Sequence, residues 1–513
     1  MFLIVIVKTF IESQVLNIAS DIKIAYNSQK NRNQKSRKDS QVSICINGLR
    51  NKVERNETIT IRVKSKNPLI KLSNTIDWNR LYLLVLPDLK NSTNKLKWWL
   101  GRKLKIRVHL AVYLLQQLLD ETDRGIEKSI AYNALYQVFC GKTTVDKWHC
   151  PDHTKIEEFR SRLSPETQCQ LANEIAKIAV KYKFARPQHL DIDSTVQESD
   201  MQHPATANIL LKTAVIARRV QKVLCEKFSK QMTSIPEISI KETKGIVKEY
   251  FFAQRKRATD YKDRKKQVID KLWSHVSDCT MPIVQKAQYL MNDFVIESLP
   301  KRQKILVDHF TRKAPALLLS LFDRRYDGSA RSTKIYSYFR DAVHCFNKGK
   351  LHKSCEFGRQ FQIGRIEGNF LYSIPSTSIH MPDAQSLKPM IKQHIDLFQT
   401  PIESIATDKG YYSKENEKLG LEFKIEKVGI QRQRRKYNKP PNNPISEEYQ
   451  EMLINRRAGI EPLIGHLKRS WQMGRSRMKS DRTTESSGYC AILGFNLRQM
   501  MRYLTGEAQP TST

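Results

Sequence analysis

The chain has 513 residues, enough for about three domains of roughly 150 residues each. Its 88 Lys and Arg residues outnumber 52 Asp and Glu residues, which gives a formal net charge of +36 and a pI near 9.8. Such an excess attracts polyanions. Because every apolar run is shorter than the about 20 residues that a membrane helix needs, the sequence favours nucleic acid over a membrane as the partner.

The compartment is indicated by the first residues and by the cysteines. The apolar run Met1–Val7 is ended by Lys8 and has no basic region before it, so it does not have the pattern of an export signal. The nine cysteines are odd in number and form no C-x-x-C pair. This usage is typical of a reducing compartment, and we expect a cytoplasmic protein.

Residues 1–66 are expected to form a basic, partly disordered leader. The stretch from Ser28 to Ser40 is almost wholly polar and basic, and such a segment buries too little apolar surface to offset the entropy of ordering. It is either a flexible arm that contacts DNA or a poorly constrained leader, and the residues do not decide between the two.

Residues 67–185 are predicted to form an all-helical domain. Apolar residues recur at helical spacing, in a series that includes Leu69, Leu72, Ile76, Val108, Val112 and Leu115. Asp152 is placed to cap the helix that carries Ile156 and Phe159. The cluster His149–His153 contains ligand-type residues, but no second pair follows at a zinc spacing, which favours a polar turn over a zinc site.

A short strand is predicted at Gln188–Val196, within a first segment of the sheet at 186–200. Apolar and acidic residues alternate there, so Asp191 and Asp193 lie on the same face of the strand. A buried strand seldom carries carboxylates without a partner ion or charge. The pair therefore marks a candidate site.

Residues 201–350 are predicted to form a basic helical insertion. The section Lys244–Lys271 is rich in Lys and Arg, and aromatic side chains such as Tyr250 and Phe251 lie among these charges. This pattern fits a DNA-binding face and a solvated helix face equally well.

Residues 351–505 return to a sheet pattern. A β-hairpin is predicted, with strands around Phe357–Ile363 and Phe370–Ile374 and its turn at Ile366–Asn369. The further elements expected are a helix with Ser386 as its possible cap, strands at Ile402–Thr407 and Leu421–Val428, a basic loop with Arg434 and Arg435, and a last helix at Thr484–Leu504. Residues 506–513 are expected to be a disordered tail.

The order strand, hairpin, helix, strand, strand, helix is RNase H-like, interrupted by the helical insertion after the first strand. We therefore predict an α/β fold in which an RNase H-like mixed sheet forms the catalytic core and an all-helical domain precedes it. Ligands of open α/β sheets gather beyond the carboxyl ends of strands, where we expect both Asp193 and Asp408.

Three carboxylates suit metal-dependent phosphoryl transfer. Two Mg²⁺ (or Mn²⁺) ions prefer carboxylate oxygens and activate the attacking and leaving oxygens of an in-line displacement. Glu461 is the candidate third carboxylate, because Pro462 removes a backbone donor and makes a helix kink or restart there. Lys468 lies two helical turns later, where it and Arg457 are candidates to hold DNA phosphates.

These blocks resemble the DDE transposases of bacterial insertion sequences. The segment Asp191-Ile192-Asp193-Ser194-Thr195 resembles the first-aspartate strand of that family, which selects Asp193 over Asp191. The segment Ala406–Tyr411 resembles its second-aspartate block. Arg457, Glu461 and Lys468 have the spacing of its third signature, and Gly101-Arg102, Phe139-Cys140-Gly141 and Phe159-Arg160 follow one another as in its helical N-terminal domain.

The resemblance covers about residues 68–505. It implies a nucleoid-associated homodimer that binds terminal inverted repeats, cleaves the DNA ends and joins them to target DNA, with Asp193, Asp408 and Glu461 as catalytic metal ligands. Arg457, Lys468, Lys409, Arg434 and Arg435 are then the expected DNA contacts.

The chain also departs from the family's pattern. Ile454 stands where the third signature has tyrosine, so that role is unfilled or belongs to Tyr449. A stand-alone metal-dependent nuclease and a non-catalytic DNA-binding remnant remain alternatives. Should Glu461 prove not to be the third ligand, Glu451 or Glu448 is next.

Overall fold

The computed structural model describes most of the chain from residue 42 onwards. The described residues are 42–47, 58–63, 66–91, 106–142, 150–253, 261–293, 295–326, 335–347, 355–375, 381–430, 447–478 and 481–509. Ser28–Ser40, Arg434 and Arg435, about which the sequence makes predictions, lie outside them. So does His149.

A two-stranded hairpin precedes the helices. Strands β1 (Val42–Asn47) and β2 (Thr58–Val63) pair antiparallel over their whole length. The sequence analysis placed both within the leader and expected no strands there.

The helices that follow confirm the helical pattern expected after residue 67. Their bounds are α2 Pro68–Thr75, α3 Trp78–Asn91, α5 Ile106–Leu119, α6 Asp123–Tyr132, α7 Ala134–Phe139, α8 His153–Arg162 and α9 Pro165–Lys181. Asp152 caps α8 as expected, because its side chain accepts hydrogen bonds from the backbone N–H groups of Thr154 (2.9 Å) and Lys155 (3.1 Å). His153 is paired with Glu127, because a carboxylate oxygen of Glu127 lies 3.0 Å from the Nδ1 atom of His153.

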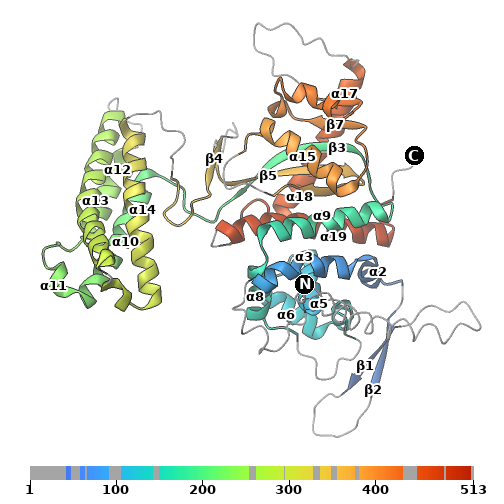
Figure 1. Cartoon of the computed structure of the whole chain (residues 1–513), viewed down its shortest axis with the longest axis horizontal. Coiled ribbons are helices and arrows are strands. Elements are labelled where there is room, and N and C mark those ends of the chain that lie inside the picture. Colours follow the sequence, from blue (N-terminus) through green and yellow to red (C-terminus); the bar gives the residue numbers. More distant parts are fainter. Residues whose placement is uncertain are drawn as a thin grey trace, which may run out of the picture.

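A mixed sheet forms the centre of the molecule (Figure 1). Its strands are β3 Arg186–Glu198, β4 His344–Asn347, β5 Cys355–Glu367, β6 Phe370–Ser373, β7 Ser404–Thr407 and β8 Lys427–Gly429. They lie in the order β4-β5-β3-β7-β8, with β6 also paired to β5. β5 runs antiparallel to β3, whereas β7 is parallel to β3 and β8 is parallel to β7.

The predicted hairpin turn is confirmed between β5 and β6. Gly368 and Asn369 both have positive φ (92° and 62°), the geometry of a tight hairpin turn. A Cβ atom on Gly368 would also lie 2.3 Å from the carbonyl oxygen of Phe184. Glycine is therefore required at this position by both the turn and the close approach of the chain.

Two local predictions in this region are wrong. The strand expected at Leu421–Val428 is instead the short helix α16 (Leu419–Glu422) followed by the three-residue strand β8. Leu421 is 87% exposed, so it does not serve as a core position of the sheet. Ser386 does not cap α15 (Asp383–Phe398), because the helix begins after Pro382 and Ser386 lies inside its first turns.

The last three helices complete this part of the fold. α17 (Glu447–Ala458) and α18 (Ile460–Ser470) meet at Gly459, and α19 (Asp481–Thr505) follows them. α19 lies between the sheet and the N-terminal helices (Figure 1). Asn496 of α19 connects three elements, because its side chain accepts from the Leu371 N–H and donates to the carbonyl oxygens of Leu371 and Ala172.

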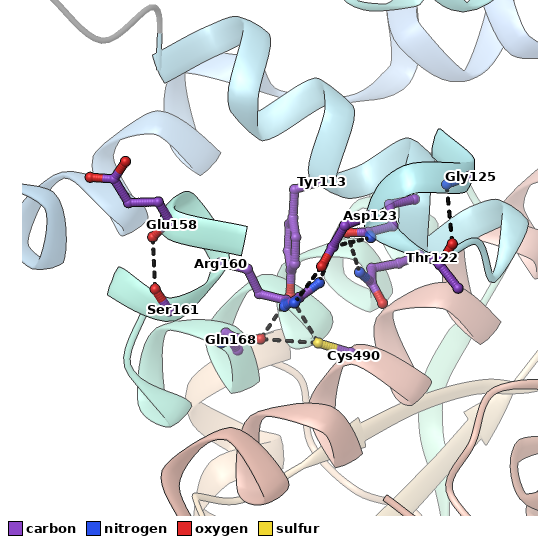
Figure 2. Close-up of polar contacts among 11 residues, drawn as sticks. Tyr113, Thr122, Asp123, Gly125, Glu158, Arg160, Ser161, Gln168 and Cys490 are labelled. Carbon is purple, nitrogen blue, oxygen red and sulfur yellow. Dashed lines mark hydrogen bonds and ion pairs between the residues drawn. The ribbon is translucent and has the colours of Figure 1, made fainter. Parts of the chain in front are cut away.

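A buried polar cluster also fixes the N-terminal helices to α19 (Figure 2). The Tyr113 hydroxyl donates to Gln168 Oε1 at 2.8 Å, and the Cys490 thiol of α19 lies 3.0 Å from the same oxygen. Beside them, Arg160 Nη2 donates to Asp123 Oδ2 at 2.9 Å. The N-terminal helices and the sheet accordingly share one hydrophobic core.

The helical insertion forms a second, separate core. Its helices are α10 Thr206–Lys227, α11 Ser229–Met232, α12 Ile240–Ala253, α13 Tyr261–Asn292 and α14 Lys301–Tyr326. Buried residues such as Leu210, Leu272 and Phe310 of these helices form one hydrophobic cluster, which Tyr338 joins from the segment after α14. Figure 1 shows the bundle standing to one side of the sheet.

Candidate active site

Asp193 lies in the interior of β3, at the point where the neighbouring strand β7 ends. β3 pairs with β7 from His189 beside Ser404 to Ile192 beside Thr407, and it pairs with β5 as far as Glu198. The expectation that Asp193 stands at the end of its strand is therefore wrong, because pairing with β5 carries β3 beyond it. The Asp193 side chain is 16% exposed.

Asp408 follows the last residue of β7, as the sequence predicted. Its side chain accepts a hydrogen bond from the backbone N–H of Lys409 at 2.7 Å and so begins the short 3₁₀ helix η2 (Lys409–Tyr411). Because Ile192 pairs with Thr407, Asp193 and Asp408 are the next residues on two parallel strands that lie about 4.8 Å apart. The two carboxylates are neighbours at this edge of the sheet.

The electrostatics of Asp193 reflect that position. Burial is the main cause that raises its pKa above the ordinary value of an aspartate, and the nearby charge of Asp408 acts in the same direction. The Arg457 guanidinium and the N–H of Ser194 lower the pKa but do not cancel the effect of burial. A carboxylate in such a position is stabilised by an added cation.

Arg457 connects Asp193 to Glu461. Its Nη2 atom lies 3.0 Å from Asp193 Oδ2, and its Nη1 atom lies 3.1 Å from Glu461 Oε1. The helix break expected near Glu461 is present, because α17 ends at Ala458 and α18 begins at Ile460 with Glu461 in its first turn. The Asp193 and Glu461 carboxylates are thus separated by the width of one guanidinium group, and Glu461 remains 61% exposed.

The donor set fits a hard divalent cation in part. Asp193 and Asp408 lie near enough for the charge of Asp408 to raise the pKa of Asp193, and carboxylate oxygens are the ligands that Mg²⁺ prefers. Within the described residues, however, no group of three His, Cys, Asp or Glu side chains is close enough to hold a metal ion. Glu461 is instead paired with Arg457 through one of its carboxylate oxygens.

Behind this edge lies a polar layer that the sequence analysis missed. The buried Tyr411 hydroxyl donates to Gln362 Oε1 at 2.6 Å, and Gln362 and Gln360 both donate to Asp383 Oδ1, at 3.0 and 2.6 Å. Burial, followed by the charges of Asp383 and Asp193, raises the pKa of Tyr411. The alternate glutamines at 360 and 362 on a predicted strand were the available signal, because they share one face of β5.

The remaining expected DNA contacts are dispersed. Lys409 is exposed beside Asp408. Lys468 lies in the last turn of α18, where its Nζ atom is 4.0 Å from Glu356 Oε2 of β5. Ile454 and Tyr449, the two positions considered for the tyrosine role, belong to α17, but their side chains are not among those described.

None of the helices among the described residues combines the length and the apolar character that crossing a bilayer requires.

Comparison with known proteins finds matches to part of the chain. A protein of Rhizobium meliloti described as "Uncharacterized protein ORF8 in nfe locus" is 24% identical over 120 residues, which are 23% of this chain and 58% of that protein. The chain thus matches little more than half of the length of that relative. No solved structure matches the chain.

Residues 57–162 match the family described as "Transposase domain (DUF772)". The match begins at β2 and ends with α8, so it covers most of the helices for which the sequence predicted an N-terminal transposase-like domain. These comparisons support a transposase-family protein.

Proposed function

We propose that this protein is a transposase that cleaves the ends of an insertion sequence and joins them to target DNA by metal-dependent phosphoryl transfer. The observation that carries the proposal is the register of β3 and β7, which makes Asp193 and Asp408 neighbours at one edge of the sheet. The match of residues 57–162 to a transposase domain supports the same reading from a separate part of the chain.

The strand arrangement supports an RNase H-like catalytic core. A central strand, β3, has antiparallel neighbours on one side and parallel neighbours on the other. This is the mixed sheet expected from the sequence, with the helical insertion entering after the first strand. The edge at which β7 ends is also where ligands of open α/β sheets bind.

Asp193, Asp408 and Glu461 would hold two Mg²⁺ or Mn²⁺ ions. Such ions, when bound, stabilise the charge on the attacking and leaving oxygens of a phosphodiester. Arg457 pairs with both Asp193 and Glu461 and balances part of their negative charge. Its planar group is also suited to bind a phosphate through two parallel hydrogen bonds.

The positive charge of the chain suits a DNA substrate. With a net charge of +36, binding should release counterions and weaken steeply with salt. Lys409, Lys468, Arg434 and Arg435 are the proposed phosphate contacts. We further propose a homodimer in the bacterial cytoplasm, associated with the nucleoid, whose N-terminal helices bind terminal inverted repeats.

The test is an assay of the purified protein with Mg²⁺ and DNA that carries the ends of its own element. A transposase yields joined products as well as cuts, whereas a stand-alone nuclease yields cuts alone. The variants Asp193→Ala, Asp408→Ala and Glu461→Ala should each reduce cleavage by on the order of 1,000-fold, while DNA binding in a gel-shift assay stays within about twofold.

Lys414→Ala is a suitable matched control, because it changes an exposed charged residue between η2 and α16, outside the proposed machinery. If Glu461→Ala still cleaves at the wild-type rate, the third carboxylate is not Glu461, and Glu451 and then Glu448 should be replaced. If neither aspartate variant affects cleavage, the proposed site is wrong.

A further inference from the structure

β3 carries two aspartates on one face, and their surroundings differ. Asp191 and Asp193 are two residues apart and project to the same side of the sheet. Asp191 is 2% exposed, and Asp193 keeps contact with solvent at the edge of the proposed site. The buried Asp191 carboxylate is therefore excluded from direct contact with a substrate, and its charge must be balanced within the protein.

Two arginines from distant parts of the chain supply that balance. Arg456 of α17 donates from Nε to Asp191 Oδ1 at 2.8 Å, and Arg365 of β5 places its Nε 3.4 Å from Asp191 Oδ2. Arg456 also donates to the Ser404 hydroxyl of β7 and to the carbonyl oxygen of Leu190. The end of α17 is thereby fixed to β3 and β7 at once.

Arg365 in turn lies against the junction of α17 and α18. A Cβ atom built on Gly459 would lie 2.1 Å from Arg365 Nη1. The φ angle of Gly459 is −65°, which any residue adopts, so a side chain at this position would affect the structure by displacing the Arg365 guanidinium and not by straining the backbone. The Arg365 guanidinium, which is paired with Asp191, fills the space that a side chain at position 459 would occupy.

Consecutive residues of α17 thus contact alternate residues of β3. Arg456 pairs with Asp191, and the next residue, Arg457, pairs with Asp193 and Glu461. Movement of Arg456 away from Asp191 would move Arg457 and the start of α18 with it. A displacement of about 1 Å in a catalytic group costs on the order of 100-fold in rate.

We propose that Asp191 is a positioning residue, which acts through Arg456 and Arg365 to hold the α17–α18 junction so that Arg457 and Glu461 face Asp193. The inference rests on the proposed function of that site. It assigns the two aspartates of the D-x-D sequence separate roles, one at the reacting centre and one beneath it. Buried ion pairs contribute little to stability compared with apolar packing, which agrees with a role in placement.

The test uses full-length protein and two measurements. The first is the Mn²⁺ affinity, obtained from the electron paramagnetic resonance signal of the free ion, and the second is the single-turnover rate of DNA cleavage. Asp191→Asn keeps the shape of the side chain and removes its charge. We expect its Mn²⁺ affinity and cleavage rate each to fall by about 10- to 100-fold, the range for residues that orient metal ligands. DNA affinity should remain unchanged.

Gly459→Ala provides a second variant that changes no charge. Its methyl group should displace Arg365 and lower the Mn²⁺ affinity and the cleavage rate in the same way. If circular dichroism shows that Asp191→Asn does not fold, the Gly459→Ala variant decides whether the positioning role holds. Glu485→Gln is the matched control, because it breaks an equally buried ion pair with Arg359 of β5. It should lower the melting temperature without changing Mn²⁺ affinity.

The outcomes separate the two proposals. Wild-type protein that binds no Mn²⁺ and does not cleave DNA would refute the proposed function itself. The other outcome is that the wild-type protein binds Mn²⁺ and cleaves DNA, while the variants at 191 and 459 differ from it only in a lower melting temperature. That result would overturn the positioning role and leave the proposed function intact.

Discussion

Arg457 is the residue on which the charges of the site converge. It contacts Asp193 and Glu461 through different nitrogen atoms, and its buried Nε atom has no hydrogen-bond partner among the residues that the structure describes. Asp408 adds a further negative charge, which raises the pKa of Asp193. One guanidinium therefore balances part of the negative charge of the three carboxylates, and bound divalent ions would balance the rest.

Replacement of Arg457 should change the pH dependence of metal binding. Arg457 lowers the pKa of Asp193, which burial otherwise raises, so Arg457→Gln should raise that pKa further. Metal binding requires the ionised carboxylate. The pH below which Mn²⁺ affinity falls should therefore be higher in Arg457→Gln than in wild type, and less so in Arg457→Lys.

Arg469→Gln, at an exposed position of α18, controls for the loss of one positive charge. An Arg457→Gln variant whose affinity is altered by the same factor at every pH would show that the guanidinium does not influence the ionisation of Asp193.

For single residues, the pattern of the sequence did not show which of Asp191 and Asp193 belongs to the proposed site. Both lie on one strand face, and only resemblance to a known motif favoured Asp193. The contacts that distinguish them come from Arg365 and Arg456, which are far away in sequence. Asp383 was missed for the same reason, because its partners Gln360 and Gln362 belong to another element.

Among the elements, α15 is docked onto the sheet by a buried histidine. His394 is fully buried, and its Nε2–H donates to the carbonyl oxygen of Pro187 at 2.7 Å, while Nδ1 has no partner. The rings of Tyr372 and Phe398 pack against it. Burial lowers the pKa of His394 from 6.5 to about 4, so the imidazole is neutral in the folded protein at neutral pH.

This histidine should make stability depend on pH. The unfolded chain takes up a proton as the pH falls below 6.5, whereas the folded protein does so only near pH 4, so the free energy of unfolding should fall across that interval. The full loss from this group is about 3 kcal/mol. His394→Gln, which keeps a donor for Pro187, should show a smaller loss between pH 6.5 and 4 in urea unfolding.

His466→Gln, at an exposed position of α18, is the matched control for removing a histidine and should unfold like wild type at each pH. An equal loss of stability in His394→Gln and wild type would mean that another group is responsible.

Elements with strong local signals were predicted well, and the others were not. The Gly368–Asn369 turn and the restart of the helix before Pro462 depend on local chemistry, and both are present. β3 is longer than predicted because its pairing with β5 continues past the end of β7, which no local pattern reveals. The strand expected at Leu421–Val428 was wrong although apolar and charged residues alternate there, because a helical turn ends at Glu422 and Lys424 then adopts a positive φ of 55°.

The whole molecule is built around two hydrophobic cores. The first joins the N-terminal helices to the sheet through α19, so the region that matches a transposase domain is packed against the proposed catalytic core. The second is formed by the α10–α14 bundle together with Tyr338, which follows it. Because the bundle has its own core, substitutions on its outer surface should leave the fold of the site intact.

One face of the bundle has the charge pattern of a DNA contact. Lys241, Lys244 and Lys248 of α12 are exposed and lie along one side of the helix at spacings of three and four. The adjacent Glu249 is paired with Lys271 at 3.2 Å. In the described part of the chain, no ion pair joins these three lysines to a carboxylate, and exposed Phe251 and Phe252 follow them.

Replacing the three lysines with glutamine should therefore weaken DNA binding in a salt-dependent way. Each phosphate contact contributes about 0.9 to the slope of log K against log salt concentration, so the slope should become shallower by about 2 to 3. Fluorescence anisotropy with duplex DNA over a series of salt concentrations measures this slope.

A control variant with glutamine at the exposed residues Lys222, Lys227 and Lys230 of the same bundle removes equal charge. If both variants change the slope equally, the net charge of the bundle matters and α12 does not form a specific contact; if neither does, the face is simply solvated.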